Sequence, residues 1–306
     1  MGLVAFVVNR TLLHDPLVFV RRGQAAARDR GWEPWFAPTG DAKDGRAVAR
    51  EAVARGARLV FAAGGDGTVR ACAEALAGTG VPLAIVPLGT ANLTARALGL
   101  PGRTAGALEA GFGGRDRKID LARIEGGGGK GGGARIEGSG IWFAAMAGIG
   151  LDAAVVEAAR APLKRRFGWV AYAMTGAARL SLPPRDFTVR LDGAEPLRRR
   201  ARCVVVGNAG LLPGGFTLLP AARLDDGRLD VGVLAPSGPW GWARLAGRVL
   251  APSMGQDGQL EHFTARHVRI SADSELPRQV DGEIVTPGRT LEVSVCPGAL
   301  IVRQPW

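Results

Sequence analysis

The chain has 306 residues, of which 47% are hydrophobic and 22% are charged, and this balance excludes a protein that is disordered throughout. Arginine and lysine outnumber aspartate and glutamate by 39 to 28, so the formal net charge of +11 favours an anionic partner such as a phosphate group or an acidic lipid surface. The cysteines, Cys72, Cys203 and Cys296, form no CxxC pair and indicate neither a disulfide framework nor a zinc site, which favours a cytoplasmic protein.

The start of the chain and its apolar runs bear on a membrane location. The first ten residues, MGLVAFVVNR, lack a basic segment before the apolar run and predict a buried strand rather than a signal peptide. The longest apolar run, residues 141–151, is shorter than the ~20 residues that a membrane-spanning helix needs. We therefore expect no transmembrane segment, and any membrane contact is expected to be peripheral, at the inner face.

The first part of the chain alternates strand-like and helix-like segments. Residues 44–56 are typical of a helix, with Asp44 as a candidate N-cap, Gly56 as a stop and an apolar stripe between them. Alternating strands and helices predict a parallel sheet, so we expect an α/β domain over residues 1–115. The expected strands are residues 3–8, 32–37, 58–63 and 81–86.

From about residue 116 to residue 291 strand-like segments follow one another, which predicts a second, largely β domain. A glycine-rich tract at residues 126–133 separates two copies of ARIEG and is interpreted as the tip of an elongated hairpin. The expected strands begin at Ile119, Arg135, Asp186, Ala201, Arg228, His267 and Leu291.

The segment FAAGGDGTV, residues 61–69, places a glycine turn between a strand and a helix. Backbone N–H groups at such a turn bind anions, and glycines let phosphate oxygens approach the backbone. The turn lacks the Gly-Lys-Ser/Thr ending of a Walker A loop. Asp66 beside a phosphate requires a cation between them, so it is interpreted as acting through Mg²⁺ or orienting the reacting hydroxyl, and Thr68 as binding a phosphate oxygen or capping the helix. The alternative is that Asp66 is only the helix N-cap.

Residues 81–101 repeat this design with a strand, a Gly-Thr turn at Gly89 and Thr90, and a predicted helix. Asn92 and Arg96 lie four residues apart, which places both on one face of a helix. Two such turns on neighbouring strands are expected to converge at the carboxyl edge of the sheet, where open α/β sheets bind ligands. Nucleotide binding is the function that this pattern predicts.

Two acidic segments follow in the second domain. DDGRLD, residues 225–230, gathers carboxylates around a glycine, a ligand type that suits a hard cation, although the residues alone favour a surface turn with solvated acids. Asp281 and Glu283 flank Gly282, so on an extended segment their side chains point the same way, and one would remove a hydroxyl proton while the other holds a metal. A tight hairpin turn is the alternative there.

These motifs together resemble the diacylglycerol kinase catalytic-domain family, soluble bacterial lipid kinases related to diacylglycerol and sphingoid-base kinases. GGDGT alone is shared with NAD kinases and phosphofructokinases, whereas its combination with the later blocks is far more specific. The matching segments are Asn9, GGDGT at 64–68, PLGTANLTAR at 87–96, Asp120, FAAMAGIGLDA at 143–153, the block at 206–231 and VDGE at 280–283.

The resemblance implies an N-terminal α/β domain like that of NAD kinases and a C-terminal β-sandwich, with ATP in the cleft between them. It also implies that about residues 292–306 return to the first domain. By the same comparison, Glu283 is the general base, and Asp226 holds a structural Mg²⁺ together with the backbone carbonyls of Arg223 and Arg228. The residues implied to contact ATP are Asn9, Thr39, Gly64, Gly65, Asp66, Gly67, Thr68, Val69, Arg70, Gly89, Thr90 and Asn92.

Three positions depart from the family pattern. Arg10 follows Asn9 where the family usually has proline, and Phe216 follows Gly214 and Gly215 where a third glycine is common. Leu93 stands where many members have aspartate, which puts in doubt a water–metal network through that position, while Asp120 and Arg96 remain.

Two stretches combine basic and aromatic residues in the way that interfacial helices on anionic membranes do: residues 161–184, with Lys164, Arg165 and Arg166, and residues 239–254, with Trp240 and Trp242. The alternative is that the aromatic side chains belong to the core and the arginines to a solvated face. The partner expected from the sequence is thus a lipid substrate at a membrane surface. No motif indicates nucleic-acid binding, and a homodimer stays open.

The predicted function is an ATP- and Mg²⁺-dependent lipid kinase that phosphorylates a lipid hydroxyl, diacylglycerol first. Glu283 would take the proton from the lipid hydroxyl, and Asp281 would hold a metal beside it. Asp66 would align the phosphates, and Arg96 would complement developing charge or organise Asp120. Alternatives are a kinase for a sphingoid base, an isoprenoid or another long-chain alcohol, an NAD kinase, and a non-catalytic nucleotide- or lipid-binding regulator.

Overall fold

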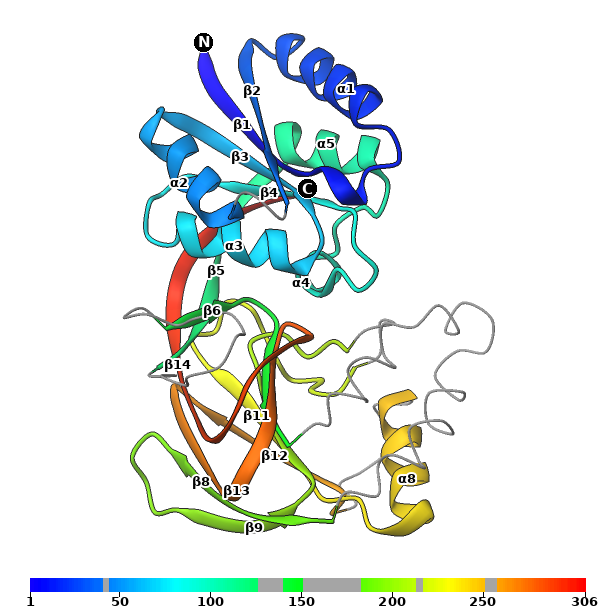
Figure 1. The fold of residues 1–306 in the computed structure, drawn as a ribbon, viewed down its shortest axis with the longest axis vertical. Helices are drawn as coiled ribbons and strands as arrows, with labels where there is room; N and C mark the ends of the chain where they lie inside the picture. Colours follow the sequence, from blue (N-terminus) through cyan, green and yellow to red (C-terminus); the bar gives the residue numbers. More distant parts are fainter. Residues whose placement is uncertain (41–43, 126–139, 151–182, 213–216, 251–257) are drawn as a thin grey trace. The chain divides into compact units, whose positions relative to one another are not determined.

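The computed structural model describes the 306-residue chain except for residues 41–43, 126–139, 151–182, 213–216 and 251–257 (Figure 1). The chain divides into two compact units. The first comprises Met1–Leu121 and Pro297–Trp306, and the second comprises Ala122–Cys296. Within the described residues, no helix is long and apolar enough to cross a membrane.

The first unit is built on a parallel sheet, as the alternating pattern predicts. Its strands lie in the order β4-β3-β1-β2, and the end of β14 (Glu283–Gln304) joins the sheet through a parallel pairing of Val302 with Leu83. Strands β1, β3 and β4 are largely buried apolar runs, which is typical of parallel sheets covered on both faces, whereas β2 ends the strand order and is only partly buried. The four strands are β1 (Gly2–Asn9), β2 (Trp32–Thr39), β3 (Ala57–Gly64) and β4 (Leu83–Pro87).

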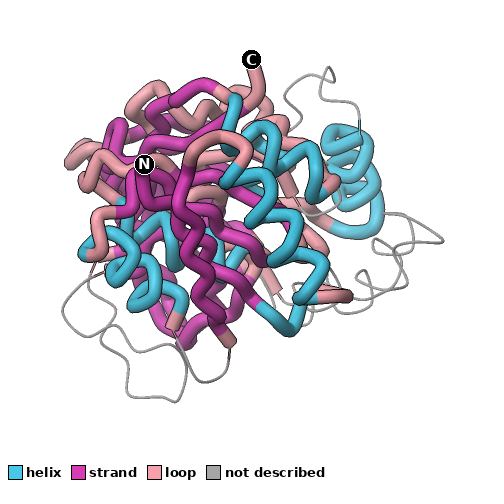
Figure 2. The backbone as a smooth tube through the Cα atoms, turned by 90° about the horizontal axis from the view of Figure 1, so that it is seen from above, coloured by secondary structure: helices cyan, strands magenta, loops and turns pink. Residues whose placement is uncertain are grey.

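Helices alternate with these strands and pack on the sheet, an arrangement that can be followed in Figures 1 and 2. Asp44 caps the predicted helix by accepting a hydrogen bond from the Arg46 N–H, which confirms its expected start. The helices of this unit are the 3₁₀ turn η1 (Arg10–Leu12) and α1 (Pro16–Arg28), α2 (Gly45–Ala54), α3 (Asp66–Leu76), α4 (Leu93–Ala97) and α5 (Thr104–Gly113).

Aromatic rings fill the core between the sheet, α1 and α5. The Phe6 ring stacks between the rings of Phe36 and Phe61, with centroid distances of 4.4 Å and 4.7 Å, and Phe112 lies 4.8 Å from Phe61. Burying several such rings contributes much of the apolar area that stabilises a unit of this size. This core fixes the strands whose carboxyl ends carry the glycine turns.

The second unit is an antiparallel β structure with one described helix, α8 (Gly238–Leu250). Its strands follow the order β12-β11-β10-β7-β13-β14, with β8 paired to β13 and β9. Strands β9 and β12 had not been predicted as separate elements. Strand β5 (Arg115–Ile124) begins in the first unit and ends in the second. The other strands are β6 (Ile141–Phe143), β7 (Met146–Ile149), β8 (Arg185–Leu191), β9 (Leu197–Ala201), β10 (Cys203–Gly207), β11 (Leu229–Leu234), β12 (Leu260–Ala265) and β13 (His267–Val280).

The thiols give a first testable expectation about packing. Burial raises the pKa of Cys72 and of Cys203 to about 12, so neither forms an appreciable amount of thiolate near neutral pH. Cys296 is half-buried and remains accessible to a reagent. We expect a thiol reagent to modify one cysteine of the folded protein at pH 8 and three in denaturant, and Cys296→Ser to abolish the native reaction. Fast native labelling of Cys72 or Cys203, read by mass spectrometry, would contradict this packing.

Candidate functional site

The first glycine turn links β3 to α3 at the carboxyl edge of the sheet. Gly65 is the N-cap of α3 and offers no side-chain cap, so the N–H groups of the first turn have no partner from a capping side chain. A Cβ atom at Gly64 would collide with the side chain of Thr68, which is 9% exposed, so only glycine fits there. The partly exposed start of this eleven-residue helix carries a partial positive charge that suits a phosphate group.

The second turn links β4 to α4. Asn92 is the N-cap of α4 and has a φ of 47°, and its amide spans the turn: Oδ1 accepts from the Gly89 N–H at 3.0 Å and Nδ2 donates to the Gly89 carbonyl at 2.6 Å. Arg96 is exposed, and its Nε donates to the Ala91 carbonyl at 2.8 Å. The helix therefore starts after Asn92, and the prediction that Asn92 and Arg96 share one face of a helix is wrong because Asn92 has a left-handed backbone conformation. A nucleotide contact by Asn92 stays a prediction.

The two turns lie against each other, as the repeated design predicts. Gly64 is in parallel register with Pro87, and the Leu88 N–H donates to the Gly64 carbonyl at 2.9 Å. A Cβ atom at Gly89 would lie 2.7 Å from the Gly65 Cα, so the backbones approach as closely as glycine allows. The convergence of the two turns at one edge of the sheet is confirmed.

Asp66 joins these turns. It is the first residue of α3, and its Oδ1 accepts a hydrogen bond from the Leu93 N–H at 2.6 Å. The alternative in which Asp66 is the helix N-cap is therefore wrong, because Gly65 holds that position and the carboxylate bonds to the neighbouring turn instead. The Asp66 carboxylate is half-buried at the start of the helix. A cation bound beside it would neutralise its negative charge.

Other predicted residues of the first unit lie at the same strand ends. Asn9 ends β1 in register with Thr39 at the end of β2, and its Oδ1 accepts from the Thr11 N–H at 3.1 Å. Thr90 is exposed after β4, and Gly67 and Arg70 are partly exposed on α3.

Val69 and Asp120 serve the packing of the first unit. Val69 is 4% exposed, and its N–H donates to the Gly65 carbonyl, which disfavours a role in nucleotide binding because both its side chain and its donor are used within the unit. Asp120, in β5, is 3% exposed and accepts from the Gly298 N–H at 2.7 Å, so it holds the returning β14 segment.

Residues 280–283 form a two-residue hairpin turn between β13 and β14. Val280 pairs with Glu283, and Asp281 and Gly282 have φ values of 46° and 79°. The expectation of an extended segment with both acids on one side is therefore wrong, because positive φ at two successive residues reverses the chain.

The carboxylate of Asp281 has several backbone partners. It is 5% exposed and accepts from the N–H groups of Ala145 and Met146 at 3.0 and 2.9 Å, and from that of Ala144 at 3.3 Å. Its own N–H donates to the Met146 carbonyl at 2.7 Å. Asp281 thus anchors the turn to β7 and the residues before it, and it sets the backbone position of the partly exposed Glu283.

The predicted metal residues lie in an exposed turn before β11. Asp226 Oδ1 accepts from the Arg228 N–H at 3.0 Å, and Gly227 has a φ of 69°, so a local Asx turn shapes this segment. Arg223, Asp226 and Arg228 are exposed. Their role as Mg²⁺ ligands stays a prediction.

A pair of a buried aspartate and a partly exposed histidine next to this turn had not been predicted. Asp230 is 1% exposed, and its Oδ1 lies 2.6 Å from Nε2 of His262 on β12. Burial raises the pKa of Asp230, whereas the hydrogen bond from His262 lowers it. The sequence contained a signal in the last acid of DDGRLD, but its partner lies 32 residues away on a strand that was not anticipated.

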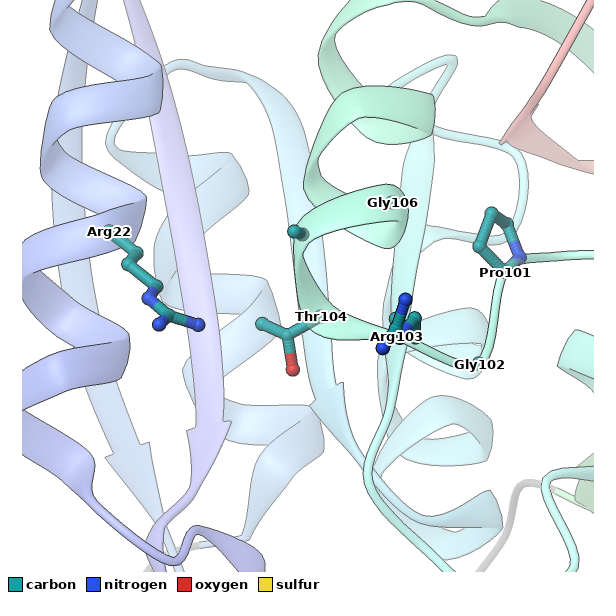
Figure 3. A pocket seen from close by; sticks show the side chains of 7 residues that line it. Arg22, Pro101, Gly102, Arg103, Thr104 and Gly106 are labelled. Carbon is teal, nitrogen blue, oxygen red and sulfur yellow. The ribbon is translucent and has the colours of Figure 1, made fainter.

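Several sequence predictions fall outside the described residues. These are the glycine tract at 126–133, the basic and aromatic stretch at 161–184, Gly214, Gly215, Phe216 and the last part of FAAMAGIGLDA. A cavity of about 570 Å³ in the first unit lies elsewhere than the predicted residues: Arg22 on α1 and Thr104 at the start of α5 point toward it (Figure 3).

Comparison with known proteins supports the class that the fold and the turns define, a two-domain kinase with an NAD-kinase-like architecture. The family model described as "Diacylglycerol kinase catalytic domain" matches residues 15–124, and "YegS C-terminal NAD kinase beta sandwich-like domain" matches residues 145–304. The chain belongs to this diacylglycerol kinase and YegS-like family of lipid kinases.

Individual relatives agree with this assignment. The chain is 35% identical over 296 residues to a "Probable lipid kinase YegS-like" of Pseudomonas aeruginosa, covering 94% of this chain and 89% of the relative. It is 30% identical to a "Diacylglycerol kinase" of Mycobacterium tuberculosis, covering 100% and 96% of the two chains.

Solved structures share the fold. A putative diacylglycerol kinase from Bacillus anthracis superposes with a TM-score of 0.76 at 22% identity, covering 99% of this chain and 97% of that one. An NAD kinase from Archaeoglobus fulgidus in complex with ATP superposes with a TM-score of 0.54 at 12% identity, covering 99% and 93%. The second unit accordingly is β-sandwich-like, as the resemblance implied.

Proposed function

We propose that this protein transfers the γ-phosphoryl group of ATP to the hydroxyl group of diacylglycerol, forming phosphatidic acid. Membership of a lipid kinase family implies ATP as the phosphoryl donor. The observation that carries the proposal is the Asp66 carboxylate, which links two glycine turns beside a helix N-terminus at the carboxyl ends of parallel strands.

The residues of the first unit fit a nucleoside triphosphate with Mg²⁺. Gly64 and Gly89 let the two turns pack closely, since a Cβ at Gly64 would collide with Thr68 and one at Gly89 with Gly65, and the N-terminus of α3 that starts at this turn suits a phosphate group. When bound, Mg²⁺ would neutralise phosphate charge, with Asp66 as the carboxylate that holds it directly or through water. Positioning and charge stabilisation of this kind supply most of the catalysis in phosphoryl transfer.

Glu283 is the proposed general base in the second unit. It follows a turn that Asp281 anchors by three backbone hydrogen bonds, so its backbone position is well defined. Its carboxylate is partly exposed and therefore accessible to an acceptor hydroxyl. Asp281 in this proposal is a positioning residue, because its oxygens are engaged by N–H groups.

Phosphate transfer to a lipid panel tests the proposal. The wild-type protein with Mg²⁺ and γ-labelled ATP would be presented with diacylglycerol, monoacylglycerol, sphingosine, ceramide and an isoprenoid alcohol in mixed micelles, and with NAD as a soluble control. We expect label in diacylglycerol and its loss in Glu283→Gln. Label in another lipid would show that this lipid, and not diacylglycerol, is the acceptor. Label in NAD alone would overturn the assignment of a lipid acceptor.

The outer side of α8 is proposed to contact an anionic membrane. Leu245 and Val249 are 5% exposed and pack into a core cluster with Trp242, whereas Trp240 is 82% exposed and Arg244 is exposed. Of the two alternatives for this stretch, Trp242 fits the one in which the aromatic side chains belong to the core, and Trp240 fits the one in which they face a membrane. An exposed tryptophan beside arginine suits the lipid interface, and the net charge of +11 adds attraction to anionic headgroups.

Vesicle co-sedimentation tests this contact. We expect Trp240→Ala to lower partitioning onto phosphatidylglycerol vesicles by about fivefold, and high salt to lower it further, because an aromatic anchor and charge attraction are both lost. Trp306→Ala is the matched control, since Trp306 is 88% exposed in the first unit. Equal loss in both variants, or none in either, would contradict a specific role for α8.

A further inference from the structure

Three potential metal ligands meet on strands of the second unit. They are Glu125, which directly follows β5, His267 at the start of β13, and Glu292 in β14. One ligand atom from each side chain lies within 4.8 Å of the other two. His267 Nε2 is 3.1 Å from Glu292 Oε1, and Glu125 Oε1 accepts from the Ser294 hydroxyl at 2.6 Å.

Strand pairing fixes this Glu125–His267–Glu292 cluster. In the antiparallel register His267 stands opposite Ser294, and the Glu125 N–H donates to the Glu292 carbonyl at 2.8 Å. The alternating residues Val268 and Val293 are fully buried in the core. Side chains on a strand alternate between faces, so the ligand side chains lie on the outer face, where those of His267 and Glu292 are 39% and 30% exposed.

We propose that this cluster binds a divalent transition metal ion, with Zn²⁺ as the first candidate. The imidazole distinguishes it from an ordinary acidic patch, because neutral imidazole together with carboxylates suits Zn²⁺, whereas Mg²⁺ prefers oxygen ligands throughout. Three protein ligands leave at least one coordination position for water. These ligands belong to the second unit, whereas the nucleotide residues proposed above belong to the first, and the inference does not depend on the kinase activity.

The charges around the cluster set its expected behaviour. Two carboxylates within this distance repel each other, and a cation relieves that repulsion. Arg269 Nη1 lies 3.8 Å from Glu292 Oε2 and offsets part of the negative charge, so it would compete with the ion. Bound metal would join the end of β5 to β13 and β14.

Metal titration of the full-length protein tests the inference, using Zn²⁺ or Co²⁺ alone after treatment with a chelator and without nucleotide or lipid. We expect one tight equivalent, a Co²⁺ absorption spectrum with nitrogen and oxygen ligands, and a shift of the His267 imidazole resonance. His267→Gln should weaken binding by at least about tenfold. His14→Gln is the matched control, because His14 is exposed in the first unit, and it should bind as the wild type does.

A second variant keeps the test decisive if His267→Gln folds poorly. Glu125→Gln preserves the shape of a solvent-accessible side chain and removes its charge, so it should also weaken Zn²⁺ binding and reduce the rise in melting temperature on adding Zn²⁺. Equal binding by the wild type and both variants would show adventitious surface binding and overturn the proposal. No binding by the folded wild type at micromolar Zn²⁺ would overturn it as well.

Discussion

Replacing Asp66 with asparagine should lower kcat for phosphoryl transfer by at least about a hundredfold while leaving the melting temperature nearly unchanged. Asn retains an oxygen that can accept the Leu93 N–H bond, so the link between the two glycine turns should survive. The negative charge that balances a cation beside the phosphates is lost, and charge stabilisation of this kind typically accounts for about 10²–10³ in rate. Steady-state kinetics over a range of Mg²⁺ concentrations measures this effect.

Asp66→Ala separates the structural role of this carboxylate from its catalytic one. Alanine removes both the charge and the acceptor, so we expect the same loss of kcat together with a lower melting temperature, because the Leu93 N–H loses its partner. If Asp66 only holds the turns together, the asparagine variant would keep wild-type kcat and the alanine variant alone would be impaired. That pattern would refute a role for Asp66 in handling the phosphates.

Replacing Asp281 with asparagine should lower the free energy of unfolding of the second unit by about 3 kcal/mol. The carboxylate is 5% exposed and accepts from three successive backbone N–H groups, and an amide presents a donor where one oxygen now accepts. Leaving a buried donor without a partner costs about 1–3 kcal/mol, and hydrogen bonds to a charged group are stronger than neutral ones. Urea unfolding of the full-length wild type and variant measures the change.

Asparagine is the informative substitution here because it tolerates the φ of 46° that Asp281 adopts. The measured loss then reports the hydrogen bonds rather than backbone strain. Asp192 provides a matched control: it also has a positive φ, at 50°, and accepts from two backbone N–H groups, those of Arg266 and His267, but it is exposed. Asp192→Asn should cost less. An equal or smaller loss for Asp281→Asn would argue against the anchoring role.

Much of the first unit could be predicted because its signals are local. Apolar runs of five to eight residues became parallel strands, and Asp44 and Gly56 marked the limits of a helix as their chemistry requires. The two glycine turns were predictable for the same reason, since a strand followed by glycines and a helix has few conformations. Their convergence followed from the parallel order of the strands.

Other features depended on contacts between distant segments. Asp66 bonds to a backbone N–H 27 residues away, which no side-chain pattern reveals. His262 meets Asp230 through β12, a strand with polar and apolar residues too mixed to stand out. At Asp281 and Gly282, a hairpin and an extended segment were both compatible with the sequence, and the partners at residues 144–146 favour the turn.

The measurement that tests the central claim most directly is transfer of labelled γ-phosphate from ATP with Mg²⁺ to diacylglycerol in mixed micelles, comparing wild type with Glu283→Gln at matched folding. We predict labelled phosphatidic acid with the wild type and a loss of at least about a hundredfold in the variant. ATP binding by the folded wild-type protein without label in any lipid of the panel would contradict the kinase proposal and support a non-catalytic nucleotide-binding regulator.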